Sequence, residues 1–154
     1  MRVTLRTAAP GELAWINERY RSIDFRPSGA DDFQAVAEVD GKPAGLGRIV
    51  PIEERVGELG GMLVFDEYRG SGLSKAIIGF LAQSTHFDFL YCLPFANLEN
   101  LYASFGFRRV DRCADVPAKV LEKYHWCAAF YPEPVLLMGR SLSVQPGADG
   151  QALS

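Results

Sequence analysis

The sequence contains few of the residues that could hold a domain together covalently or through a metal. It has 3 cysteines, Cys92, Cys113 and Cys127, which are widely spaced and form no CxxC pair. This odd number argues against a disulfide framework and favours reduced thiols in a cytoplasmic protein. Cys113, His125 and Cys127 could be drawn as three ligands of a zinc ion, but no fourth ligand is evident in the sequence. We therefore expect no metal and interpret the cysteines as small buried side chains.

Long apolar runs and long basic runs are also missing. No segment approaches the roughly 20 apolar residues of a transmembrane helix, and the N-terminus lacks the apolar region of a signal peptide. The formal net charge is −3, and basic residues cluster no further than pairs such as Arg108 and Arg109. Bulk attraction to nucleic acid is therefore excluded, and any phosphate binding must be local. We expect neither a membrane nor a nucleic-acid partner.

What remains is the composition of one globular domain. The 154 residues are 48% hydrophobic and 23% charged, which is typical of a chain that buries its own core. No internal repeat or interdomain linker is evident. We expect one domain over residues 1–140 and a flexible tail over residues 141–154, where Pro146, Gly147 and Gly150 occur.

The chain is organised around a predicted strand, turn and helix over residues 58–83. Residues 59–65 are all apolar or glycine, which predicts a strand buried on both faces. Glycines at positions 70 and 72 allow positive φ, and the following helix leaves unpaired N–H groups at its positive end. Together these features favour a cradle for a phosphate or pyrophosphate. The alternative is a structural turn that binds nothing, since the pattern is neither a Walker loop nor GxGxxG.

This turn resembles the acyl-CoA signature of the GNAT superfamily of N-acetyltransferases, [RQ]-x-x-G-x-[GA]. The matching residues, in order, are Arg69, Gly70, Ser71, Gly72, Leu73 and Ser74. Ser74 replaces the usual glycine or alanine. Residues 101–107 resemble a second motif of the family, L-Y-x-x-x-G-F, with Tyr102 as its tyrosine. The family often has asparagine seven positions before that tyrosine; this chain has Phe95 there, and Asn97 lies nearby.

The order of predicted elements also resembles the family over most of the chain. We expect strands at residues 2–7, 33–39, 44–50, 56–65, 88–93, 108–112 and 135–138. We expect helices after Pro10, from residue 73, before Gly106 and over residues 114–131, the last with Asp115 as a candidate N-cap. Asp40 and Gly41 predict a type I′ hairpin turn. The fold class is therefore α/β (α+β), a mixed and mostly antiparallel sheet flanked by helices. The resemblance implies a V-shaped cofactor wedge between parallel strands at 58–65 and 88–93.

The chemistry that the resemblance implies is amine attack on the thioester of acetyl-CoA. An alkylammonium has a pKa of about 10, so a base must take its proton at neutral pH. Glu58 is the only carboxylate in the strand at 56–65, where desolvation should raise its pKa. Family members often place a glutamate base on this strand, acting directly or through water. The alternative for Glu58 is a strand-edge residue that faces solvent or pairs with an arginine such as Arg48.

The resemblance further implies roles for the remaining site residues. Backbone groups of Leu63 and Val64 would hold the pantetheine arm, the amides of residues 69–74 would hold the pyrophosphate, and Asn97 is a further cofactor candidate. Tyr102 would protonate or hydrogen-bond the departing thiolate; the alternative for Tyr102 is a core aromatic. Direct transfer is expected rather than a route through Cys92, because no histidine forms a recognisable dyad with it.

The expected function is N-acetylation of a primary amine on a small molecule or protein. The alternative is a non-catalytic acyl-CoA-binding or sensor module, against which the presence of both Glu58 and Tyr102 argues. The acceptor would lie among residues 23–32, 51–55 and 116–130. In the first two segments Phe25, Arg26, Glu53 and Glu54 are candidates by position. Dimerisation is common in the family, so the resemblance also implies a homodimer as one assembly.

Overall fold

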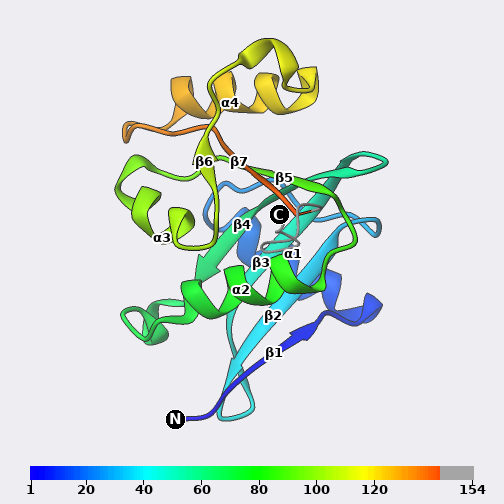
Figure 1. Ribbon diagram of the computed structural model, residues 1–154. Coiled ribbons are helices and arrows are strands. Elements are labelled where there is room, and N and C mark those ends of the chain that lie inside the picture. The colour runs from blue at the N-terminus through cyan, green and yellow to red at the C-terminus, as the bar shows by residue number, and fades with distance from the viewer. Residues whose placement is uncertain (143–154) are drawn as a thin grey trace, which may run out of the picture. The chain divides into compact units, whose positions relative to one another are not determined.

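The computed structural model describes residues 1–142 (Figure 1). The predicted tail at 141–154 lies outside the described residues from residue 143 onward, while Ser141 itself ends a strand. The described residues divide into two compact units: residues 1–51 with 59–85, and residues 52–58 with 86–142. No helix among the described residues is long and apolar enough to cross a membrane.

Among the described residues, seven strands form one sheet, in the order β1 (Val3–Thr7), β2 (Phe33–Val39), β3 (Lys42–Glu53), β4 (Val56–Val64), β5 (Phe89–Cys92), β7 (Met138–Ser141) and β6 (Arg108–Arg109). The pairs β1–β2, β2–β3, β5–β7 and β6–β7 are antiparallel. The predicted fold class is confirmed: the chain is an α/β protein whose mixed, mostly antiparallel sheet is accompanied by helices.

The first unit is built from a meander of strands with two helices. Its elements are β1 (Val3–Thr7), α1 (Leu13–Arg21), β2 (Phe33–Val39), β3 (Lys42–Glu53), β4 (Val56–Val64) and α2 (Leu73–Ser84), with β3 and β4 each giving residues to both units. The hairpin between β2 and β3 turns at Asp40 and Gly41, whose φ values of 51° and 84° are those of a type I′ turn. This turn therefore forms as predicted.

The two helices of this unit cover opposite faces of its strands. On one face, Ile16 and Tyr20 of α1 pack with Val36 and Leu46. On the other, a Cβ at Gly47 would lie 2.5 Å from Ile77 of α2. Side chains alternate along a strand, so Leu46 faces α1 while its glycine neighbour lets α2 approach closely.

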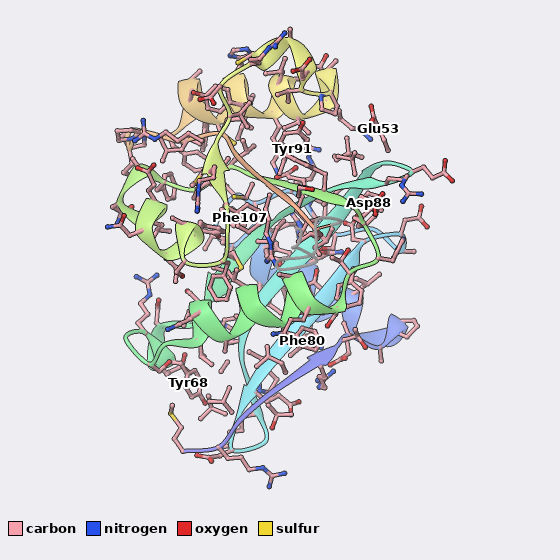
Figure 2. All side chains as sticks on the ribbon, in the orientation of Figure 1. Glu53, Tyr68, Phe80, Asp88, Tyr91 and Phe107 are labelled. Atoms are coloured by element: carbon pink, nitrogen blue, oxygen red, sulfur yellow. The ribbon has the colours of Figure 1, made fainter. Side chains whose placement is uncertain are left out.

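The second unit contains β5 (Phe89–Cys92), α3 (Glu99–Ala103), β6 (Arg108–Arg109), α4 (Ala118–Phe130) and β7 (Met138–Ser141). Val120 of α4 is fully buried and packs in one cluster with Tyr91 and Leu137. Tyr91 lies on β5 beneath α4 (Figure 2). Gly106 has a φ of 92° and ends the short helical segment, as predicted.

Several predicted boundaries are wrong in this unit. The last strand is Met138–Ser141 rather than 135–138, because its register is set by β5, where Cys92 pairs with Met138. Val135 makes only an isolated bridge to Phe95. Asp115 is not the N-cap of α4: it ends a 3₁₀ turn, and extended Pro117 precedes the helix without a side-chain cap. The strand predicted over 108–112 is limited to Arg108–Arg109.

Candidate active site

The turn between β4 and α2 presents exposed backbone rather than side chains. Gly70 and Gly72 have φ values of 78° and 81°, a left-handed conformation that L side chains rarely adopt. Nothing lies within 4 Å of an ideal Cβ at either position. Gly72 is the N-cap of α2, and no side chain caps this end within the described part of the chain. The first N–H groups of the helix therefore have no side-chain cap, and the space beside both glycines is open.

The flanking side chains fold back onto the turn itself. Arg69 Nε lies 3.1 Å from Asp66 Oδ1, and Ser71 donates its hydroxyl hydrogen to the Tyr68 carbonyl. Tyr68 belongs to the 3₁₀ turn Asp66–Tyr68 that precedes the glycines (Figure 2). The exposed amides and the positive end of a 12-residue helix fit a pyrophosphate group.

The strand before this turn is less buried than its apolar sequence predicts. Residues 57–59 of β4 are buried, but Leu63 and Val64 are only half-buried. The prediction of burial on both faces is therefore wrong for the second half of β4. Gly61, with a φ of 60°, interrupts the regular strand, and its carbonyl accepts a 2.7 Å hydrogen bond from the Tyr20 hydroxyl.

Glu58 is buried and ion-paired. It is 3% exposed, and its Oε2 accepts a 2.7 Å hydrogen bond from Nζ of Lys123 on α4. Neither alternative from the sequence holds, because Glu58 neither faces solvent nor pairs with Arg48. The partner was missed because Glu58 and Lys123 are 65 residues apart. Arg48 is buried in the other unit, where its Nη1 donates to the Arg26 carbonyl and to Ser28 Oγ.

Cys92 interacts electrostatically both with Glu58 and with Tyr102. Tyr102 is 4% exposed and packs edge-on against Phe107, with ring centroids 5.8 Å apart. Burial raises the pKa of the Tyr102 hydroxyl, and Cys92 raises it further. Burial also raises the pKa of the Cys92 thiol, and the Glu58 carboxylate adds to that shift. The cluster therefore holds a neutral phenol and a neutral thiol beside an ion-paired carboxylate.

The other predicted residues lie in varied surroundings. Asn97 is exposed in the 3₁₀ turn Ala96–Leu98 that leads into α3. Phe25 is partly buried: its ring stacks on that of Tyr20, with centroids 6.0 Å apart, and packs against the core cluster around α1. Glu53 and Glu54 are exposed at the end of β3 and in the turn after it, and Glu53 is labelled in Figure 2.

The outer surface of α4 carries an aromatic pair that the sequence pattern did not single out. Trp126 and Phe130 are 53% and 51% exposed, and their rings stack with centroids 4.6 Å apart. Tyr131 packs edge-on against both rings.

Among the described residues, no group of three or more His, Cys, Asp or Glu side chains could hold a metal ion. Cys113 is exposed and Cys92 and Cys127 are buried.

One comparison with known proteins identifies a family. The model of the acetyltransferase (GNAT) domain matches residues 31–109. A search of curated proteins finds no match. Among solved structures, N-acetylglutamate synthase from Neisseria gonorrhoeae, complexed with coenzyme A and N-acetylglutamate, aligns with a TM-score of 0.68 and 16% identity. The match covers 94% of this chain and 36% of that enzyme, so this chain spans about a third of its length.

Two further structures align with this chain over nearly their whole length. The ribosomal-protein-S18-alanine N-acetyltransferase from Escherichia coli has a TM-score of 0.65 and 16% identity, over 94% of this chain and 97% of that one. A Salmonella typhimurium protein solved with its cofactor acetyl-CoA has a TM-score of 0.65 and 16% identity, over 95% and 97% of the two chains. At these identities the likeness shows the fold.

Proposed function

The chain belongs to the GNAT acetyltransferase family, and we propose that it transfers an acetyl group from acetyl-CoA to a primary amine. The observation that supports catalysis most directly is the buried, ion-paired Glu58, whose carboxylate raises the pKa of Cys92, the same thiol that adds to the raised pKa of Tyr102. A carboxylate and a neutral phenol supply the base and the acid that amine attack on a thioester requires. The acceptor is a small-molecule or protein amine, as the names of two matching structures also suggest.

Glu58 is the proposed base. Its Oε2 accepts a 2.7 Å charge-assisted hydrogen bond from Lys123, which holds the Glu58 side chain in place. Glu58 takes a proton from the acceptor ammonium, directly or through a water molecule, and the neutral amine then attacks the thioester carbonyl. The new carbon–nitrogen bond forms as the carbon–sulfur bond breaks.

Tyr102 is the proposed acid. With an ordinary pKa of about 10 a phenol is already protonated at neutral pH, so Tyr102 can donate its proton to the departing CoA thiolate. Burial argues against a covalent route through Cys92, since the thiolate is the nucleophilic form and its formation is disfavoured. Direct transfer needs no acyl-enzyme.

The turn at residues 69–74 is the proposed pyrophosphate site. Its amides and the N-terminus of α2 would hold the phosphates, as the open space around Gly70 and Gly72 permits. Leu63 and Val64 at the end of β4, and Asn97, remain predicted contacts of the remainder of the cofactor.

A thermal-shift titration tests cofactor binding first. Acetyl-CoA at about one hundred times its dissociation constant should add about 2.7 kcal/mol of stability, whereas ATP and NAD should add none. Coenzyme A should behave as acetyl-CoA does. No shift with acetyl-CoA at millimolar concentration would reduce the glycine turn to a structural feature and remove the proposed function.

Turnover distinguishes the enzyme from a binding module. Thiol release should be measured over a panel of amino acids, polyamines and peptides with free N-termini. Glu58→Gln and Tyr102→Phe should each lower kcat by about 10²–10⁴-fold while acetyl-CoA still produces its thermal shift. Binding without thiol release from any amine, or full turnover in both variants, would favour the sensor module or other catalytic groups.

A further inference from the structure

The second unit already holds a primary amine against the proposed base. The chain has 4 lysines, Lys42, Lys75, Lys119 and Lys123. The first three are exposed, and among the described residues no carboxylate forms an ion pair with any of them. Lys123 is different: its side chain is 24% exposed, and its Nζ is 2.7 Å from the Glu58 carboxylate.

The position of this amine is fixed by the packing of α4. Val120 and Cys127 lie one turn to either side of Lys123 and are both buried, so this face of α4 points inward. The Lys123 side chain leaves the same face and reaches Glu58, whose own side chain is 4% exposed. The amine is therefore held at its carboxylate by buried packing rather than by a surface ion pair that opens freely.

We propose that Lys123 is a self-acetylation site, in which its Nζ takes the acetyl group from acetyl-CoA bound to the same molecule. This proposal rests on the proposed function, because it uses the same base and the same cosubstrate. It adds an activity that needs no external acceptor.

The reaction balances without any further reagent. The Lys123 ammonium gives a proton to Glu58, the neutral Nζ attacks the thioester carbonyl, and the carbon–sulfur bond breaks. Tyr102 protonates the departing thiolate and recovers a proton from the attacking nitrogen, which loses its second proton as the amide forms, while Glu58 releases its own proton to water. The net result is an amide on Lys123, free coenzyme A and one proton.

Acetylation at this site has a consequence for the base. The amide carries no charge, so Glu58 loses the cation that compensates its buried carboxylate. The ammonium of an external acceptor can then occupy the place that Nζ leaves. An acceptor bound first would keep Nζ from the base, so acceptor amines should slow the self-acetylation.

The test uses the purified full chain and acetyl-CoA with a deuterated acetyl group, so that acetylation from the expression host is not counted. Cleavage after glutamate separates Lys119 in residues 100–122 from Lys123 in residues 123–133. Label should enter Lys123 at least about a hundredfold faster than exposed Lys119 on the same helix, the low end of a general base's contribution. The first-order rate should not change on dilution of the protein.

Variants separate enzymatic from chemical acetylation. Glu58→Gln should abolish the excess rate at Lys123 and leave the slow labelling of the exposed lysines unchanged, whereas Lys119→Arg should leave Lys123 labelling intact. The comparison of the two lysines within the unaltered protein does not depend on whether Glu58→Gln folds. Equal labelling of all 4 lysines would mean chemical acetylation only and would overturn the proposal.

Thiol release with external amines, measured on the same preparation, separates this proposal from the proposed function. Acetylated external amine with unlabelled Lys123 would overturn self-acetylation and leave the acetyltransferase standing. Labelled Lys123 without turnover of any external amine would support self-acetylation as the activity of this site. No thermal shift with acetyl-CoA and no labelling would overturn both.

Discussion

Removing Lys123 should destabilise the protein more than removing both members of its ion pair. In Lys123→Met, the Glu58 carboxylate would remain in a position where its side chain is 4% exposed, without its cation. Breaking a fully buried pair costs about 3–5 kcal/mol, and the 24% exposure of Lys123 lets water compensate in part. We therefore expect a loss of about 2–3 kcal/mol in the free energy of unfolding at pH 7.

The other two variants complete a thermodynamic cycle. Glu58→Gln leaves the Lys123 ammonium able to turn toward water, so we expect a loss of about 1 kcal/mol. The double variant has neither charge and should be within about 1 kcal/mol of the unaltered protein, because apolar or neutral replacements of a buried pair are often nearly neutral. The coupling free energy should then be about 2–4 kcal/mol.

Urea unfolding at neutral pH measures the free energy of unfolding of the unaltered protein, the two single variants and the double variant. Lys119→Met, an exposed position one turn earlier on α4, is the matched control and should change stability by less than about 0.5 kcal/mol. If Lys123→Met unfolds with the same free energy as Lys119→Met, the carboxylate does not depend on its partner. A loss in the double variant equal to the sum of the two single losses would also refute the reasoning.

Three further predictions concern the backbone, the acid response and the thiols. Gly61→Ala should cost about 2–4 kcal/mol and Gly41→Ala about 1 kcal/mol in urea unfolding. Both have positive φ, but only at Gly61 would a Cβ lie 2.8 Å from Arg48 Nε and the Tyr20 hydroxyl. An arginine hydrogen bond lowers the pKa of Glu12 to about 2, so its stabilisation should be lost as pH falls from about 4.5 toward 2, and Glu12→Gln should flatten the Tm profile there. A thiol reagent should modify exposed Cys113 readily and Cys92 only on unfolding.

Each of these has a clear contrary result. Equal losses at the two glycines would mean that the space around Gly61 adjusts to a methyl group. Arg6 Nη1 lies 2.7 Å from Glu12 Oε1. If Glu12→Gln leaves the fall of Tm at acid pH unchanged, this ion pair does not contribute to stability. Modification of Cys92 as fast as Cys113 would show that the thiol is accessible and would reopen a covalent route.

Most elements were predictable from the sequence because their signals are local. The strand at Phe33–Val39 matches its prediction in full, and the Asp40 and Gly41 turn follows from residues that tolerate positive φ. The boundary errors arise where pairing with a segment distant in the sequence sets the ends of a strand. The apolar residues from Val135 predicted the last strand, but pairing with β5 shifts the regular strand to Met138–Ser141.

The candidate site was predictable only in part, for the same reason. The glycine turn and the burial of Glu58 follow from short patterns, and both are present in the structure. Lys123 was not predictable, because a lysine in an amphipathic helix is normally solvated and nothing local distinguishes it from Lys119. Its role depends on how α4 packs within its unit, which spacing along the chain does not encode.

The charges around Glu58 favour direct transfer to the amine over a covalent route through Cys92. The carboxylate raises the pKa of Cys92, and Cys92 in turn contributes to the raised pKa of Tyr102. A covalent route would require a second negative charge on the Cys92 thiolate beside Glu58, which the buried environment opposes. Proton transfer from an amine to Glu58 instead removes a charge from the cluster, and Tyr102 keeps its proton until a thiolate forms. The same buried carboxylate therefore serves base catalysis and opposes the acyl-enzyme, so Cys92→Ala should retain turnover while Glu58→Gln should not.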